Sequence, residues 1–237
     1  MKTNFIVGGI GLLVLSVPMV HAQGTFQNLD FENGTFIPIP GDPYGQVDWS
    51  LAMPGWTGYI GTNQADRLLH NNTFLDSAGM GIYGPDNPPG WFHGHYYISL
   101  HLGLDLGGSG QFLVPAIAQT GTIPSSAQSF ELEAYAAGFT VTFAGNDIPM
   151  SVVGGSASTY YIYGGDISAF AGQAGELRLR GGGFFDYLQF SDQPVPEPTV
   201  FALSALGALL LRWRLVRRLG PLPEPTRARP KEQCHRG

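Results

Sequence analysis

Cysteine is nearly absent from this chain of 237 residues, and its single copy, Cys234, lies close to the C-terminus. A lone cysteine closes no disulfide within one chain, so a disulfide-stapled domain is excluded. The chain also lacks the sequence motifs of serine hydrolases, zinc peptidases, phosphate-binding loops and dinucleotide-binding folds. Glycoside cleavage stays open as an alternative, because its paired carboxylates need no local motif.

Basic residues are scarce between positions 23 and 194. These 172 residues hold fifteen Asp and Glu but only Arg67, Arg178 and Arg180, which gives a formal charge of −12. Phosphate recognition depends on Lys and Arg, so this composition argues against nucleic acid and anionic lipid as partners of this segment. Divalent cations are better suited to so acidic a surface. The length is that of one domain.

Apolar runs long enough to cross a membrane are also missing from the N-terminus. Lys2 precedes an apolar stretch over residues 5–17, which is shorter than the ~20 residues of a spanning helix. The sequence Val20-His21-Ala22 then offers small or slender residues at the two positions that a signal peptidase must fit. We expect residues 1–22 to be a signal peptide, helical in its core, that is cleaved between Ala22 and Gln23. The alternative is an N-terminal membrane anchor.

At the other end, the motif Val195-Pro196-Glu197-Pro198 leads into a second apolar stretch. This stretch covers residues 199–216 and is interrupted or followed by four arginines, Arg212, Arg214, Arg217 and Arg218. Apolar residues beside a basic cluster predict a transmembrane helix whose C-terminus lies inside the cell. Residues 219–237, rich in proline and arginine, have no core-forming pattern and are expected to be disordered.

The order of Pro-Glu-Pro, apolar helix and arginine cluster resembles the PEP-CTERM sorting signal over residues 195–218. The resemblance implies recognition and cleavage by the membrane protease exosortase near Pro196, Glu197 and Pro198. It implies that the arginines hold the tail in the membrane, and that the host makes extracellular polysaccharide. The chain departs from the family because such tails normally end soon after the arginines, whereas this one continues to Gly237.

Between the two ends, short apolar runs rich in β-branched and aromatic residues alternate with glycine and proline. This pattern predicts an all-β antiparallel sandwich for residues 23–194. A turn is expected at Asn146-Asp147 and one short helix at residues 166–171. Strands are expected at residues 96–102, 111–119, 130–135, 139–143, 148–153, 158–163, 175–180 and 184–190.

The two ends of this domain, Asn28–Gly34 and Phe185–Phe190, resemble those of galactose-binding-like jelly rolls. The resemblance implies a jelly-roll topology in which the first and last strands are neighbours. It also implies a structural calcium ion, for which Asp30, Glu32 and Asp186 are the candidate ligands. The alternative is that these three acids are solvated residues at strand edges.

Trp49, Trp56 and Trp91 lie among prolines and glycines in what the pattern predicts to be loops. Their rings are candidates for stacking on sugars, with the alternative that they pin the loops onto the core. Together these features predict a non-enzymatic exported protein, a membrane-anchored precursor that reaches the cell surface or extracellular matrix and associates with polysaccharide. A secreted polysaccharide-active enzyme and a purely structural surface protein are the alternatives.

Overall fold

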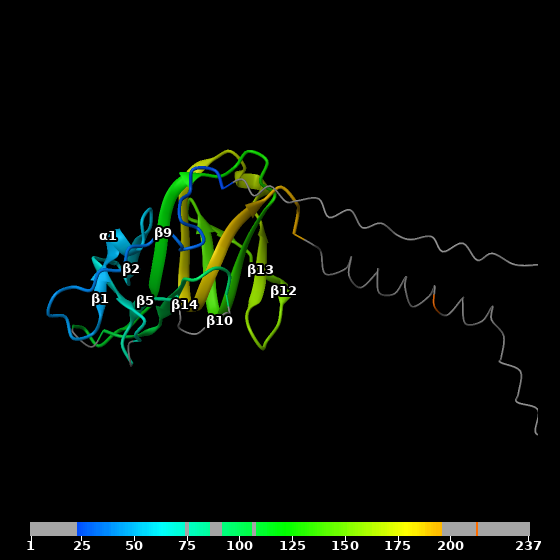
Figure 1. Cartoon of the computed structure of the whole chain (residues 1–237). Helices are drawn as coiled ribbons and strands as arrows, with labels where there is room; N and C mark the ends of the chain where they lie inside the picture. Colours follow the sequence, from blue (N-terminus) through cyan, green and yellow to red (C-terminus); the bar gives the residue numbers. More distant parts are fainter. Residues whose placement is uncertain (1–22, 74–75, 86–91, 106–107, 196–211, 213–237) are drawn as a thin grey trace, which may run out of the picture. The chain divides into compact units, whose positions relative to one another are not determined.

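The computed structural model describes residues 23–73, 76–85, 92–105, 108–195 and 212. The described chain is all-β, as the alternating pattern predicts. Two long strands, β10 (Ser129–Phe143) and β14 (Ala174–Ser191), pair antiparallel along most of their length and lie side by side in the middle of the domain (Figure 1). Every other strand of the large sheet attaches directly or indirectly to this pair.

The remaining elements are shorter. The strands are β1 (Gln46–Asp48), β2 (Thr57–Ile60), β3 (Asn63–Ala65), β4 (Arg67–His70), β5 (Gly79–Tyr83), β6 (Tyr97–His101), β7 (Gly103–Leu104), β8 (Phe112–Leu113), β9 (Pro115–Thr122), β11 (Asn146–Ile148), β12 (Ser151–Gly155) and β13 (Tyr161–Asp166). The helices are α1 (Trp49–Ala52) and the 3₁₀ turn η1 (Ser168–Phe170).

The register divides the large sheet into two layers that share β10 and β14. In the first layer, the second half of β10 and the first half of β14 lie between β11 on one side and β9, β2 and β3 on the other. In the second layer, the first half of β10 and the second half of β14 lie between β13–β12 and β6–β5–β4–β1. The fold is therefore sandwich-like. Among the described residues, the strands of the large sheet pair antiparallel except for β4 and β5, which run parallel, so the expected purely antiparallel sheet is corrected at this point.

Apolar side chains from both layers form one core, because alternate residues of each strand face inward. Phe26 connects the layers: its ring lies over Gly121 of β9 and 5.3 Å from the ring of Phe190 on β14. Leu29 and Phe31, in the segment before β1, are fully buried in the same core. The N-terminal segment is thus part of the fold from its first residues.

Three local expectations need correction. The β10–β11 turn is Ala144-Gly145, with φ of 48° and 79°, so the expected turn residues Asn146 and Asp147 lie in β11 instead. The expected helix at 166–171 is reduced to the single turn η1. The Asp166 side chain accepts a hydrogen bond from the N–H of Ser168, the first residue of this turn. The sequence pattern missed α1, whose N-cap Asp48 accepts hydrogen bonds from the N–H groups of Ser50 and Leu51.

Candidate functional site

Four acidic side chains, from three separate parts of the chain, form what we call the acidic centre: Asp30, Glu32, Glu133 and Asp186. Glu133 and Asp186 are directly opposite each other on β10 and β14. Directly opposed residues of antiparallel strands have their side chains on the same face, about 5 Å apart at Cβ. Both are buried, Asp186 fully and Glu133 to 6% exposure, which is unusual for carboxyl groups.

The segment that carries Asp30 and Glu32 is held against β14 by its backbone. The N–H of Leu188 donates to the carbonyl of Leu29 at 2.9 Å, and the Asn28 side chain accepts from the N–H of Asn33. Asn28 and Phe31 adopt positive φ values of 50° and 57°, which turn the chain back on itself. These contacts place the beginning of the domain beside its last strand. The segment is not a strand, and the first strand, β1, pairs with β4, so the expectation that the first and last strands are neighbours is corrected.

A second segment, residues 92–96, crosses the acidic centre. The N–H of His93 donates to Glu133 Oε2 at 3.1 Å, while the N–H groups of His95 and Tyr96 donate to Glu32 Oε1 at 2.6 and 2.8 Å. The His93 ring stacks on that of Tyr187 with centroids 4.0 Å apart. Backbone donors of this segment thus bind two of the four carboxyl groups, those of Glu133 and Glu32.

Asp186 is the member of the acidic centre whose pKa is strongly raised. Burial away from water raises its pKa to about 9; the N–H of Tyr187 opposes this rise, and the nearby charges of Glu133, Glu32 and Asp30 add to it. Asp186 Oδ1 accepts that N–H at 2.6 Å, but within the described residues the buried Oδ2 has no hydrogen-bond partner. Burial also raises the pKa of Glu133 against the opposing effect of the His93 N–H and the Tyr160 hydroxyl.

Two kinds of chemistry suit this arrangement. Calcium prefers several oxygen ligands gathered from distant parts of a chain, and an orphaned buried carboxylate oxygen fits such an ion. Alternatively, two neighbouring carboxyl groups share one proton when both cannot be charged at once. Among the described residues, no three His, Cys, Asp or Glu side chains converge as a ready-made metal site. To bind a calcium ion, the carboxyl side chains would have to rotate toward one another, or backbone carbonyl oxygens would have to serve as additional ligands.

The candidate sugar-stacking residues are not part of this centre. Trp49 and Trp56 are each only 4% exposed, and their indole N–H groups donate to the carbonyls of Trp56 and Asn28. Their rings pack in the core, so the expectation of sugar stacking is wrong for both. They hold the loops to the core, which was the alternative. Trp91 lies outside the described residues.

Most of the expected processing residues also lie outside the described part of the chain: residues 1–22, Pro196, Glu197, Pro198, Arg214, Arg217 and Arg218. Gln23 and Val195 are described, and Arg212 only as an exposed residue. The chain divides between Val195 and Pro196 into two units, the first of which contains the whole β domain. Among the described residues, no helix is both long enough and apolar enough to cross a membrane.

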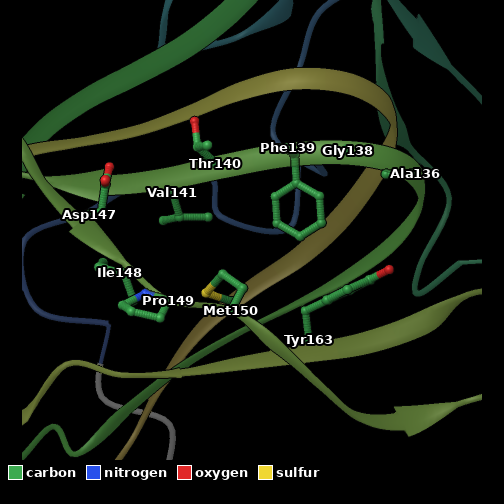
Figure 2. Close-up of a pocket in the computed structure, with 10 residues that line it drawn as sticks. All are labelled: Ala136, Gly138, Phe139, Thr140, Val141, Asp147, Ile148, Pro149, Met150 and Tyr163. Atoms are coloured by element: carbon green, nitrogen blue, oxygen red, sulfur yellow. The ribbon is translucent and has the colours of Figure 1, made fainter.

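A separate cleft of about 490 Å³ opens at the side of the sandwich, between β10, β13 and the β11–β12 connection (Figure 2). Phe139, Met150 and Tyr163 point into it, with the rings of Phe139 and Tyr163 nearly perpendicular and 4.9 Å apart. Thr140 and Asp147 are the polar side chains among its lining residues besides Tyr163. None of the four acids of the acidic centre lines this cleft.

Comparison of the chain with protein-family models, curated proteins and solved structures finds no match. The fold class is therefore the all-β, sandwich-like class that the strands themselves define. Glu133 is the member of the acidic centre that the sequence does not reveal. Glu133 stands between apolar residues of β10, a pattern that is typical of an exposed residue on a strand. The pairing register of β10 with β14 is what shows that it lies opposite Asp186.

Proposed function

We propose that this chain is an exported, non-enzymatic protein of the cell surface or extracellular matrix that associates with exopolysaccharide. Its domain is a jelly-roll-like sandwich preceded by a signal peptide, which signal peptidase removes. The segment 199–216 anchors the precursor in the membrane, and an exosortase processes it at the Pro-Glu-Pro motif. The mature protein is the β domain.

One observation supports this proposal: the compact unit that contains the β domain ends at Val195, where the motif Val195-Pro196-Glu197-Pro198 begins. β14 ends at Ser191, and the next residues are still fastened to the domain, since Ser129 Oγ donates to the Gln193 carbonyl at 2.8 Å. A methyl of Val195 lies 3.5 Å from where a Cβ on Gly164 would be. Pro196 follows directly. At the other end, the N–H of Thr25 donates to the Thr122 carbonyl, two residues after the expected mature start.

The experiment is to fractionate cells that make the native protein and to measure the intact mass of each pool. A product that starts at Gln23, ends near Pro196 and lies outside the membrane supports signal-peptide removal and sorting. A product that retains residues 212–237 in the membrane fraction refutes exosortase processing and means that the protein stays anchored.

We also propose a structural calcium ion at the acidic centre, held by Asp30, Glu32 and Asp186. Glu133 is a fourth candidate ligand, because it lies opposite Asp186 in the pairing of β10 with β14. The supporting observation is the fully buried Asp186, whose Oδ2 has no partner within the described residues. An ion there would neutralise carboxylates that otherwise repel one another. Titration calorimetry with calcium tests this. Binding heat accompanied by a higher melting temperature supports the ion, and the absence of both refutes it.

The alternative of a polysaccharide-active enzyme is favoured by one specific feature. Glu133 and Asp186 come from separate strands, face each other and have raised pKa values, as the acid of a glycosidase pair requires. Both side chains are buried, and Glu133 accepts a hydrogen bond from the His93 N–H, which argues against their contact with a substrate in this arrangement. A reducing-end assay on candidate glycans separates the two functions, because a binding protein retains a glycan without converting it.

A further inference from the structure

The outer face of the first layer carries an ordered array of side chains across four strands. The register aligns Thr140 of β10 with Arg180 of β14, then Ala116 of β9 and Tyr59 of β2. The neighbouring row aligns Thr142, Arg178, Ala118 and Thr57. We call these eight residues the arginine face. All eight lie on the strand face opposite the buried residues between them, such as Val141 and Leu179. Thr140 and Arg180 are exposed on it, whereas the small side chains of Ala116 and Ala118 are covered.

Positive charge is concentrated on this face and rare elsewhere in the domain. Residues 23–194 contain three arginines and no lysine, and two of the three are Arg178 and Arg180. Glu176 lies on the same face of β14 and pairs with Arg178, so Arg180 is the arginine of this face that forms no salt bridge among the described residues. An exposed arginine without a carboxylate partner is the group that an anionic ligand requires.

The two arginines differ in how firmly they are held. Arg178 donates from Nε to Glu176 Oε1 at 2.8 Å, and its guanidinium lies 4.4 Å from the centre of the Tyr59 ring. It is therefore a fixed group whose position is set by one carboxylate and one aromatic ring. Arg180 is exposed and, within the described residues, is not among the side chains that form salt bridges. Its guanidinium fork is free to bind a carboxylate.

We propose that the arginine face binds acidic polysaccharide, in which uronic acid carboxylates bind Arg180 and Arg178. The threonine hydroxyls on β10 bind sugar hydroxyls, and the Tyr59 ring gives an apolar edge beside them. This inference rests on the proposed association with polysaccharide and names its chemical class. Groups spread over four neighbouring strands suit a polymer that binds along its length rather than a single small sugar.

The test is affinity electrophoresis of the protein spanning residues 23–195 through gels that contain polygalacturonate or neutral dextran. A calcium chelator is present throughout, so that calcium bridges between carboxylates do not contribute. We expect retardation by polygalacturonate that weakens as salt rises. Arg180→Ala should weaken it about tenfold, the effect of losing one charge-assisted bidentate contact. Arg180→Lys should restore it only in part, because lysine has no planar fork.

Arg67→Ala is the matched control. Arg67 lies on β4 in the second layer and pairs with Asp66, so its loss changes the net charge as Arg180→Ala does, but away from the arginine face. Equal weakening by both variants overturns the proposal, because it means that net charge alone sets the retardation. Failure of polygalacturonate to retard the protein at low salt also overturns it. If dextran alone retards the protein, the arginine-face proposal fails but the proposed association with polysaccharide is supported. If neither glycan retards it, both proposals are contradicted.

Discussion

At the scale of single residues, the two buried tryptophans show how little an aromatic ring in a loop says about binding. Trp49 and Trp56 lie in segments rich in glycine and proline, as sugar-binding residues often do, yet each indole N–H donates to a buried backbone carbonyl. A buried tryptophan needs such a partner, and the partner here belongs to the protein itself. Their role is to join the segment around Asn28 to α1 and β2.

Trp56→Phe tests this role. The substitution removes the donor to the Asn28 carbonyl and leaves that buried acceptor unsatisfied, so we expect a loss of about 1–3 kcal/mol in the free energy of unfolding. Urea denaturation of the domain measures it. Tyr44→Phe is the control, because Tyr44 is 62% exposed and should change stability little. Unchanged stability in Trp56→Phe would contradict the assignment, as would loss of glycan binding without loss of stability.

Asp186→Asn tests the acidic centre at the residue that calcium should need most. Without calcium the substitution removes a carboxyl group whose ionisation is opposed by burial, so the variant should be at least as stable as the parent protein. With calcium at about 100 times its Kd, the parent protein should gain about 2.7 kcal/mol, and the variant should gain little. Thermal melts with chelator and with calcium measure both effects.

The control for this prediction is Asp192→Asn, which removes an exposed carboxylate from the segment just after β14. It should keep the calcium response of the parent protein. A response in Asp186→Asn equal to that of the control would show that the ion binds elsewhere or only loosely to surface acids.

At the scale of elements, the two longest strands continue through glycines at which the sequence pattern predicts that a strand ends. Residues 130–135 and 139–143 are expected as two strands, but β10 continues through both with a register shift between Ala136 and Gly138. Likewise, β14 continues through Gly181 and Gly183, whose φ values are 147° and 145°. Glycine at these points allows the shared strands to pass from one layer to the other. Local sequence signals the glycines but not whether the strand continues, because continuation depends on pairing with a distant strand.

A pair of glycine substitutions tests this explanation. A Cβ on Gly181 would lie 2.5 Å from the Gly138 carbonyl oxygen, and its φ of 147° is one that other residues rarely adopt. We therefore expect Gly181→Ala to cost about 1–3 kcal/mol of stability. Gly138, opposite Gly182 in the same region, has open space within 4 Å of where its Cβ would lie and no positive φ, so Gly138→Ala should stay within about 0.5 kcal/mol.

Chemical denaturation of the two variants and the parent protein gives the comparison. Equal losses would mean that the region is sensitive to any added methyl group, and that the backbone conformation of Gly181 is not the cause. A loss confined to Gly138→Ala would contradict the described bend.

At the scale of the whole molecule, the all-β class follows from the alternation of strands, whereas the site depends on long-range pairing. The resemblance of the two domain ends to jelly rolls predicts Asp30, Glu32 and Asp186 as a group. Glu133 and the arginine face were not found, because their members come together only through the register of β10 with β14 and of β14 with β9. No local periodicity encodes such a register. Burial of Trp49 and Trp56 likewise depends on the core that distant segments complete.

The same dependence on distant segments predicts which end of the domain is indispensable. Phe26, Leu29 and Phe31 lie in the first residues after the expected signal peptide, and all three are buried. Each contributes about 1.5–3 kcal/mol through burial, so together they account for a large share of a typical net stability of about 5–15 kcal/mol. A chain that starts at Thr35 should therefore fail to fold, although it keeps every strand.

Circular dichroism and thermal melts of chains ending at Val195 test this, with starts at Gln23 and at Thr35. The longer chain should melt in one cooperative transition, and the shorter should show none. The chain from Gln23 to Gly237 in detergent serves as the control and should match the melting temperature of the chain that ends at Val195. A cooperative transition in the chain from Thr35 would show that the N-terminal segment only covers the surface, and Asp30 and Glu32 would then lose the structural reason for their place beside β14.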